Sequence, residues 1–370
     1  MAQEWFIREY REGDERGILE LTEVVHGLVP DKAAWMKWWK WLYKQCPAGD
    51  AIIGIAESNG RIIGHRAIVP MAFKVKDNII TSALTVEIMV HPDYQGKGIY
   101  TALANEMLDQ VDKTDIILSI GFPNERSYPI GTQKLGFFAP TPLKIMILPL
   151  NLENIISRFI TMKLLVKIGS IIGKPFFNLI FRARKSPRIE NLLIKEVLSF
   201  DDRFDEFWNR ISADYEIIGV RNKEYLNWRY VNTPDIKYTI HVAEKNEQVV
   251  GYIVLRYGRT GNIVSGYIFD LVVLKAQQDV IQCLINSAVE YFRQQKVDLV
   301  LNFMLGPKEY YSQYRKSRFI SPGFLSKKWK FIIKINTPKL PVPEQYLIDG
   351  NNWFVQIGDA DEDLSNIRHN

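Results

Sequence analysis

A short glycine-containing segment, Gln95-Gly96-Lys97-Gly98, has the residue types needed to bind a phosphate group. Glycine adopts backbone conformations that other residues avoid, so two of them allow backbone N–H groups to turn toward one anion. A helix that begins just after such a segment adds the partial positive charge of its N-terminus. The segment therefore predicts a phosphate-binding loop, with an ordinary glycine-rich turn as the alternative.

The residues on either side predict a strand before this loop and a helix after it. Residues 85–90 alternate as a strand does, with Glu87 on one face and apolar side chains on the other. Beyond the loop, apolar residues recur at every fourth position, which is typical of a helix with one buried face: Ile99, Leu103, Met107 and Val111. The loop therefore stands where a strand gives way to a helix, although it matches neither the P-loop nor the dinucleotide-binding pattern.

A second strand-like run, residues 115–120, is followed by Asn124 and then by the tetrapeptide 134–137, Lys-Leu-Gly-Phe. In order and spacing, residues 1 to about 150 resemble the GCN5-related N-acetyltransferases (GNAT), whose acyl-CoA-binding motif reads Gln/Arg-x-x-Gly-x-Gly/Ala. Gln95 and Gly98 match that motif. Tyr100 departs from it, because it stands where glycine or alanine is usual and where the cofactor approaches the chain most closely.

The resemblance implies an acetyltransferase that uses acetyl-CoA and needs no metal. In the family, the pantetheine arm of coenzyme A lies between the fourth and fifth strands, and its phosphates lie at the glycine loop. The implied cofactor contacts here are Ile88, Met89, Val90, Gln95, Gly96, Lys97, Gly98, Ile99, Tyr100 and Asn124. The implied acceptor is a primary amine of a small molecule or an amino sugar.

Two residues are candidates for proton transfer. Glu87 lies where the family often places a carboxylate that removes the proton of the amine, and the alternative is a Glu paired with a neighbouring cation such as Arg66. The family commonly has a tyrosine that acts as the acid at the position of Thr132. Tyr128, four residues earlier, is the candidate acid here, because it can reach the sulfur if the turn after Asn124 has a different shape. Alternatively, the ring of Tyr128 packs against the helix, and solvent or no group at all acts as the acid.

The acceptor site is predicted only from a group of aromatic residues at 35–43. Trp35 and Trp39 are the candidates for a substrate pocket, although their helical spacing is equally typical of a hydrophobic core. Trp41 and Tyr43 recur in the second half of the chain, which favours a structural role for them.

The first half of the chain resembles the second when the two are offset by 187 positions. The segment 41–47, for example, falls on 228–234, and the match continues without a gap through Gly64 and Gly251. We therefore predict an α/β (α+β) fold of two tandem GNAT-like domains, each a mixed, mostly antiparallel twisted sheet flanked by helices. The predicted parts are an acyl-CoA-binding domain 1–150, a basic helical linker 151–190 and a degenerate GNAT-like domain 191–370.

The second copy lacks the phosphate-binding loop. It has Gln277-Gln278-Asp279 in place of the glycines, and the carboxylate of Asp279 would repel a diphosphate. It also lacks an equivalent of Asn124. We therefore expect only the first copy to bind coenzyme A, with the second one walling the substrate pocket or supporting the first domain.

Composition excludes several other classes of protein. The net charge of +5 favours anionic ligands but is too small to indicate nucleic-acid binding. Two cysteines and five scattered histidines give no disulfide framework and no metal-ligand spacing. The sequence shows neither a signal peptide nor a membrane span, which favours a cytoplasmic protein.

The segment 154–188 contains eight Lys or Arg and no acidic residue. Lys163, Lys167 and Lys174 fall near one face of a predicted helix, so contact with a membrane surface is one interpretation. A linker helix that keeps its lysines in water is the favoured one. The chain is expected to be a monomer or a homodimer.

Two other functions remain open at this point. Tandem copies of this fold also occur in aminoacyl or longer-acyl transferases, although those lack a good coenzyme A loop in the domain that does the chemistry. A non-catalytic acyl-CoA sensor or scaffold is the third possibility, because Thr132 replaces the usual tyrosine.

Overall fold

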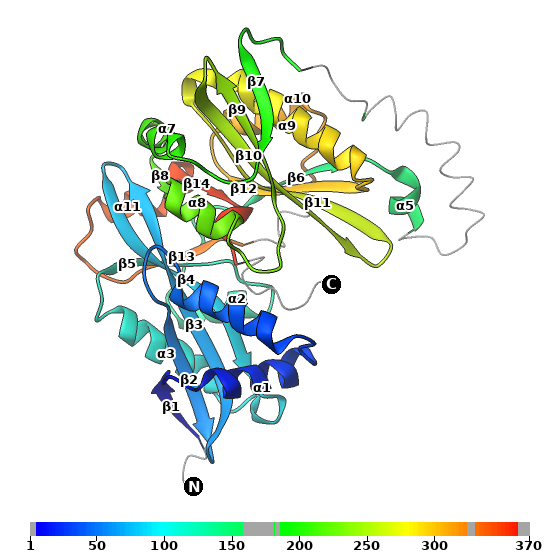
Figure 1. Ribbon diagram of the computed structural model, residues 1–370. Coiled ribbons are helices and arrows are strands. Elements are labelled where there is room, and N and C mark those ends of the chain that lie inside the picture. The colour runs from blue at the N-terminus through cyan, green and yellow to red at the C-terminus, as the bar shows by residue number, and fades with distance from the viewer. Residues whose placement is uncertain (1–4, 158–180, 182–185, 324–329, 362–370) are drawn as a thin grey trace.

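The computed structural model describes residues 5–157, 181, 186–323 and 330–361. These residues form one mixed sheet of 14 strands with helices on its faces, and the sheet continues from the first half of the chain into the second. Most of the first half forms the lower lobe in Figure 1 and most of the second half the upper one. The predicted mixed sheet flanked by helices is confirmed.

In the first half, four antiparallel strands are followed by a fifth that is parallel to the fourth. The predicted strand, loop, helix and second strand all form. The elements are β1 (Phe6–Glu9), α1 (Glu15–His26), α2 (Lys32–Lys44), β2 (Ile52–Ser58), β3 (Arg61–Val75), β4 (Asn78–Val90), α3 (Ile99–Val111), β5 (Ile116–Gly121), α4 (Ser127–Lys134), β6 (Lys144–Pro149) and α5 (Leu152–Ser157).

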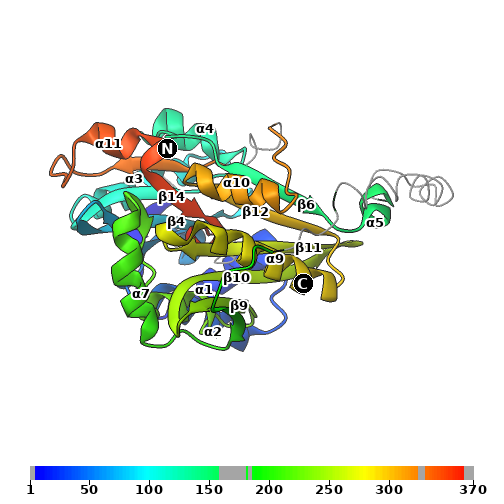
Figure 2. The same ribbon diagram turned by 90° about the horizontal axis from the view of Figure 1, so that it is seen from above.

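Helices α2 and α3 cover opposite faces of this part of the sheet. A side chain at Gly64 would meet Ile99 and Leu103 of α3, whereas the ring of the next residue, His65, contacts Tyr43 of α2. Successive residues of a strand point to opposite faces, so the two contacts lie on the two sides of β3. Figure 2 shows α1 and α2 on one side, with α3 and α4 on the other.

The second half follows the same order of strands and helices. It has an antiparallel run β7-β9-β10-β11, and β12 is parallel to β11. The elements are β7 (Leu192–Val197), α7 (Arg203–Ile211), β8 (Ile217–Gly219), α8 (Lys223–Tyr230), β9 (Thr239–Lys245), β10 (Gln248–Thr260), β11 (Ile263–Val273), α9 (Gln278–Gln294), β12 (Leu299–Leu305), α10 (Lys308–Lys316), β13 (Ile332–Ile335), α11 (Glu344–Ile348) and β14 (Trp353–Gln356).

Strands are exchanged between the two halves. β6, which precedes the proposed boundary at residue 150, pairs with β12 of the second half. In return, β13 pairs with β5, and β8 extends the sheet beside the end of β3. β14 then joins β8 to β12. The backbone hydrogen bonds therefore cross the proposed boundary in both directions.

Two tryptophans that are 187 positions apart meet between the halves. The rings of Trp41 and Trp228 are stacked with their centroids 5.0 Å apart. Each indole Nε1–H donates to the backbone carbonyl of the other residue, at 2.9 and 3.1 Å. Both side chains are buried, so this reciprocal contact fixes α2 against α8.

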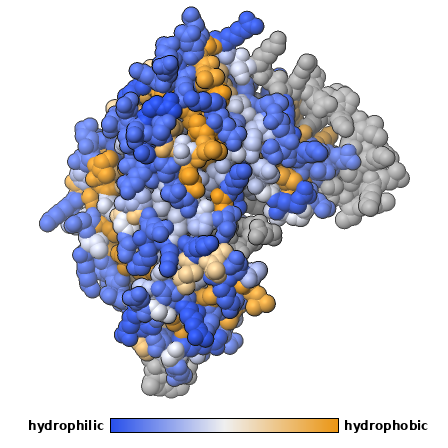
Figure 3. Space-filling model, in the orientation of Figure 1, coloured by the Kyte–Doolittle hydropathy of each residue, from blue (hydrophilic) through white to orange (hydrophobic). Residues whose placement is uncertain are grey.

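Most of the predicted linker helix, including its lysines 163, 167 and 174, lies outside the described residues. None of the helices in the described part combines the length and apolar character needed to span a bilayer. On the face seen in Figure 3, apolar residues form narrow, separate patches between hydrophilic ones.

We expect Trp41→Ala and Trp228→Ala each to lower the free energy of unfolding by about 3–5 kcal/mol, the usual cost of removing a buried aromatic side chain. Because each ring supports the other, the double variant should cost less than the sum of the two, by about 0.5–3 kcal/mol. Urea denaturation of the four proteins measures this coupling. Phe292→Ala, which removes a buried ring packed against Gly266, combined with Trp41→Ala is the additive control; additivity in the tryptophan pair as well would contradict the prediction.

Candidate functional site

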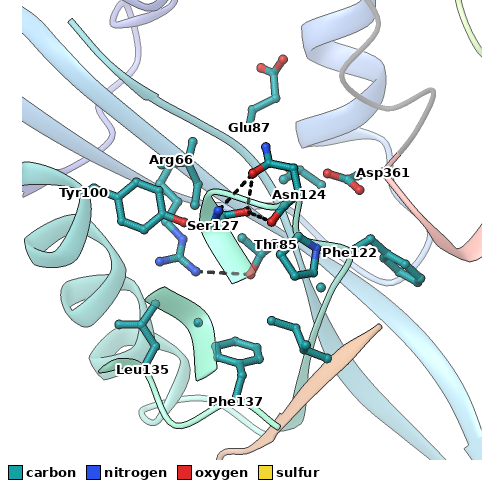
Figure 4. Close-up of a pocket in the computed structure, with 16 residues that line it drawn as sticks. Arg66, Thr85, Glu87, Tyr100, Phe122, Asn124, Ser127, Leu135, Phe137 and Asp361 are labelled. Atoms are coloured by element: carbon teal, nitrogen blue, oxygen red, sulfur yellow. Dashed lines mark hydrogen bonds between the residues drawn. The ribbon is translucent and has the colours of Figure 1, made fainter. Parts of the chain in front are cut away.

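A cavity opens where β4 and β5 stop pairing. The two strands are paired from Thr81 and Ile116 up to Leu84 and Ile120, and no pair follows among the described residues. The cavity has a volume of about 340 Å³. Its walls come from both halves of the chain: Arg66, Thr85, Val86, Glu87, Ile88, Tyr100, Gly121, Phe122, Pro123, Asn124, Ser127, Gly131, Leu135, Phe137, Ile332 and Asp361 (Figure 4).

A β-bulge in β4 shapes the wall of this cavity. Val86 pairs with Ala67 and Met89 with His65, so two residues of β4, Glu87 and Ile88, stand opposite one residue of β3. Glu87 has a φ of +42°, a left-handed conformation that costs a non-glycine residue about 1–2 kcal/mol. The bulge thus turns Glu87 out of the regular strand at the point where β4 leaves β5.

Glu87 is held from the α2 side of the sheet. The hydroxyl of Tyr43 donates to its carboxylate at 3.2 Å, and Nδ1 of His65 lies 3.2 Å from its backbone carbonyl. Burial lowers the pKa of His65 to about 4, so this ring is neutral at pH 7. The alternative partner considered for Glu87, Arg66, hydrogen-bonds instead to Thr85.

A second carboxylate, Asp361, reaches the cavity from the far end of the chain. Its side chain is partly exposed and lines the same cavity as Glu87. Desolvation raises the pKa of Asp361 to about 7, and the negative charge of Glu87 adds to the rise, while Arg229 opposes it. A carboxyl group with this pKa exchanges its proton near neutral pH.

The glycine loop has the conformation expected of an anion-binding site. Gly96 and Gly98 have φ values of +78° and +84°, and a side chain at either position would meet nothing within 4 Å. Gly98 is the N-cap of α3 and offers no side-chain cap to the first N–H groups of the helix. These donors are therefore available to an anion, and the loop is exposed.

The corresponding place in the second half is closed. There a 3-10 turn, Lys275–Gln277, leads directly into α9 without a glycine loop. When strand residues 268–273 are aligned with 85–90, which needs a few residues fewer between the strands of the second half, Asp270 corresponds to Glu87. Asp270 is fully buried and accepts hydrogen bonds from Arg221 at 2.9 Å and from Tyr252 at 2.8 Å. Gln356 donates to its other oxygen at 2.6 Å. This carboxylate is saturated by neighbouring side chains.

Comparison with known proteins identifies the first half. No curated protein sequence matches the chain. Residues 6–137 match the family model of the acetyltransferase (GNAT) domain. This part of the chain is a GNAT domain. The cavity, the bulge and the glycine loop all belong to it, apart from the residues that the second half contributes.

Solved structures share the fold of both halves together. A GCN5-related N-acetyltransferase from Anabaena variabilis has 14% sequence identity and a TM-score of 0.61, with 90% of this chain and 73% of that one covered. A probable N-acyltransferase from Enterococcus faecalis has 13% identity and a TM-score of 0.60, with 90% and 73% covered. Saccharomyces cerevisiae N-myristoyltransferase, solved with myristoyl-CoA bound, has 12% identity and a TM-score of 0.56, with 91% and 83% covered. The fold is that of GNAT acyltransferases.

The predicted cofactor residues of the GNAT domain fall into two groups. Three of the ten, Ile88, Tyr100 and Asn124, line the cavity together with the catalytic candidate Glu87. The others lie outside its wall, either in the exposed loop or in the strand and helix beside it: Gln95, Gly96, Lys97, Gly98, Ile99, Met89 and Val90.

Asn124 also has a local task. Its side-chain oxygen accepts the backbone N–H groups of Arg126 and Ser127, both at 3.0 Å, and so starts α4. This bond fixes the position of the cavity wall after β5, and it leaves the amide nitrogen of Asn124 as the group that can face a ligand.

The structure does not place Tyr128 in the wall of the cavity. Its ring packs beside Leu108, Leu135 and Phe137, and Nζ of Lys330 lies 5.1 Å from its centre. This is the packing alternative to the proton donor that the sequence suggested. Tyr100 is the tyrosine that lines the cavity, and desolvation raises its pKa.

The prediction of Trp35 and Trp39 as pocket residues is wrong for this cavity. Both belong to the main hydrophobic core, at 3% and 2% exposure, and neither lines the cavity. The ring of Trp39 packs against Tyr10 and Tyr43. The helical spacing of these tryptophans therefore reports the buried face of α2.

Sequence reasoning missed two functional candidates and mistook the role of a third. Asp361 and Ile332 reach the cavity from the second half, and no local pattern points to them. Arg66 was considered only as a partner for Glu87, although it lines the cavity itself. The one sequence signal for this part of the cavity is Tyr100, which departs from the family motif and lines the cavity together with Arg66.

The conformation of the glycine loop can be tested through stability. Gly98→Ala should lower the free energy of unfolding by about 1–2 kcal/mol, because its φ of +84° is strained for a residue with a Cβ. Gly98→Asn should cost less, since asparagine tolerates this region. Urea denaturation compares the two variants with the wild type. An alanine variant as stable as the asparagine variant would show that the loop relaxes to another conformation.

Proposed function

We propose that this chain transfers an acetyl group from acetyl-CoA to a primary amine of a small molecule or an amino sugar. The observation that carries the proposal is the cavity between the parting strands β4 and β5, which has two carboxylates in its wall and lies near an uncapped helix N-terminus. The GNAT match of residues 6–137 supports the same class of reaction.

The residues present fit coenzyme A. The backbone of residues 95–98 and the first turn of α3 offer N–H donors to its phosphates, and the space beside Gly96 and Gly98 is open. The unpaired edges of β4 and β5 offer backbone partners to the amide-containing pantetheine arm. Asn124 lies in the wall of that gap.

Bound acetyl-CoA supplies an activated thioester whose acyl carbon accepts the amine nitrogen. Glu87 and Asp361 have the complementary task of removing a proton from the amine. A carboxyl group with a pKa near 7 is half ionised at neutral pH, which suits a general base. Tyr43 holds the Glu87 carboxylate in place, and the two carboxylates together favour a cationic acceptor in their end of the cavity.

The thiol product needs one proton, which we assign to Tyr100 or to solvent. The Tyr100 hydroxyl is protonated at neutral pH, since desolvation raises its pKa from the ordinary value of 10. It lines the cavity, as Tyr128 does not.

A longer acyl donor is the second candidate. It is favoured by the whole-chain likeness to S. cerevisiae N-myristoyltransferase, the structure of which contains myristoyl-CoA. Thiol release measured with acyl-CoA donors from two to fourteen carbons and a library of amines separates the candidates. Turnover with acetyl-CoA supports the first, turnover with long-chain donors alone supports the second, and binding without turnover would favour a sensor.

Binding of coenzyme A should depend on the loop of the first half. Gly98→Asp should weaken acetyl-CoA binding at least 100-fold in calorimetric titration, because it places a carboxylate beside the diphosphate and strains the backbone. Gln278→Asp, at the start of α9, is the matched change in the second half and should leave binding intact. If Gln278→Asp abolished acetyl-CoA binding instead, this would contradict the assignment of coenzyme A binding to the first half alone.

The rate should fall as pH decreases through about 7. The pKa of Asp361 is raised to about 7, so its carboxylate loses its negative charge below that pH and stops accepting protons. Asp361→Asn should remove this fall near pH 7, because it removes the group that titrates there. The rate–pH profiles of both proteins are measured with the same amine acceptor. Titration of the acceptor itself then affects both profiles equally and cancels in their comparison.

The controls for this profile are two further variants. Glu87→Gln should lower the rate at every pH, because it removes the second carboxylate. Asp112→Asn, at an exposed residue at the end of α3, should leave the profile unchanged. Identical profiles for the wild type and Asp361→Asn would exclude Asp361 as the base.

A further inference from the structure

Arg66 is a buried cation that has no anionic partner among the residues the structure describes. Its side chain is 2% exposed, and its only hydrogen bond among the described residues is the one to Thr85, at 3.3 Å. Nε and Nη1 have no partner there. The other fully buried arginines differ: Arg221 pairs with two aspartates, and Arg229 donates to the carbonyl of Gly358 and to the hydroxyl of Tyr238.

The unpaired guanidinium faces the cavity. Arg66 is one of the residues that line it, and Figure 4 shows its guanidinium group in the region between Tyr100, Thr85 and Leu135. A buried unpaired charge is costly, so its surroundings favour the uncharged form and lower its pKa to about 10. Even so, Arg66 is protonated at neutral pH and attracts negative charge into the cavity.

Arg66 lies on the side of the sheet that faces α3. It pairs with Gly54 on β2, and a side chain at Gly54 would meet Met107 and Leu103 of α3. Residues directly opposite each other in a sheet point to the same face, so Arg66 points to α3 as well. Glu87, in contrast, is held by Tyr43 on the α2 side. The cavity therefore has a cationic end beside the glycine-loop helix and an anionic end on the opposite side.

The second half supports this interpretation by contrast. With the offset of 187 positions, Arg66 corresponds to Ile253, which is fully buried among apolar side chains. The scaffold at this position thus accommodates an aliphatic side chain. The arginine occurs in the half that has the glycine loop and the cavity.

We propose that Arg66 binds an anionic group of the acyl donor, either a phosphate of coenzyme A or a carboxylate at the end of the acyl chain. The proposal rests on the proposed function, in that the donor is an acyl-CoA. The Nε–H and Nη1–H groups of Arg66, which have no partner among the described residues, can donate charge-assisted hydrogen bonds to the oxygens of either group. Its place on the α3 side assigns that group to the donor, since the amine acceptor needs the carboxylate end.

The test measures binding of four donors to the full chain by calorimetry without an acceptor: coenzyme A, acetyl-CoA, succinyl-CoA and acetyl-pantetheine, which has no phosphate. Arg66→Met keeps the length of the side chain and removes its charge. It should weaken the binding of those donors that carry the anionic group bound by Arg66, by about 10- to 100-fold. Arg61→Met, at an exposed residue of the same strand, is the control and should bind every donor as the wild type does.

The pattern across the donors identifies the anion. If Arg66 binds a phosphate, Arg66→Met weakens all three coenzyme A compounds and leaves acetyl-pantetheine unchanged. If it binds an acyl carboxylate, the variant weakens succinyl-CoA and leaves acetyl-CoA unchanged. Equal affinities of the variant and the wild type for all four would overturn the proposal. A wild type that binds none of them would overturn the proposed function itself.

Thermal unfolding separates ligand binding from a structural role. Without a ligand, Arg66→Met should unfold at the same or a higher temperature than the wild type, because it removes an unpaired buried charge. With the donor present, it should lose the ligand-induced rise in unfolding temperature. A ligand-free variant that unfolds at a clearly lower temperature would indicate a structural role instead. If Arg66→Met does not fold, Arg66→Lys supplies the test, with binding weakened less than tenfold as the expected result.

Discussion

The site depends on one constraint, that β4 and β5 are hydrogen-bonded at one end and separated at the other. Pairing ends at Leu84 and Ile120, and the bulge at Glu87 bends β4 just beyond that point. In the described part of the chain no strand pairing joins β4 to β5 beyond that point, and backbone groups at such strand edges need a ligand, water or another partner. The strained φ of Glu87 is consistent with a conformation maintained by the surrounding structure rather than by local preference.

The second half of the chain completes this site by exchanging strands with the first. β13 pairs with β5 and brings Ile332 to the cavity, while the segment after β14 brings Asp361. Asp359 anchors that segment, because its carboxylate forms an ion pair with the buried guanidinium of Arg221 at 2.8 Å. A buried ion pair of this kind gives little net stability, but breaking it leaves an uncompensated charge, so it is well suited to fixing where a segment lies. The half that contains the cavity thus depends on the other half for its geometry.

The local part of the site could be predicted from the sequence, and the long-range part could not. A strand, a glycine loop and a helix leave a pattern within about twenty residues, and β4, residues 95–98 and α3 follow it. Asp361 is 274 positions from Glu87 and reaches the cavity only through strand exchange, for which no pattern exists. Trp35 and Trp39 show the opposite difficulty, because aromatic residues at helical spacing look the same in a pocket and in a core.

The two halves show how one scaffold becomes an open site in one place and a closed one in another. Tyr43 donates to Glu87, and Tyr230, its counterpart 187 positions on, donates to Asp270 at 3.4 Å. The shared contact is therefore a property of the scaffold. What differs is the cation: in the second half Arg221 pairs directly with Asp270, and both side chains are fully buried. In the first half the cation is Arg66, which hydrogen-bonds to Thr85 and lies on the α3 side of the sheet, whereas Tyr43 holds Glu87 on the α2 side. The cavity of the first half therefore keeps a cationic end and an anionic end on opposite sides of the sheet.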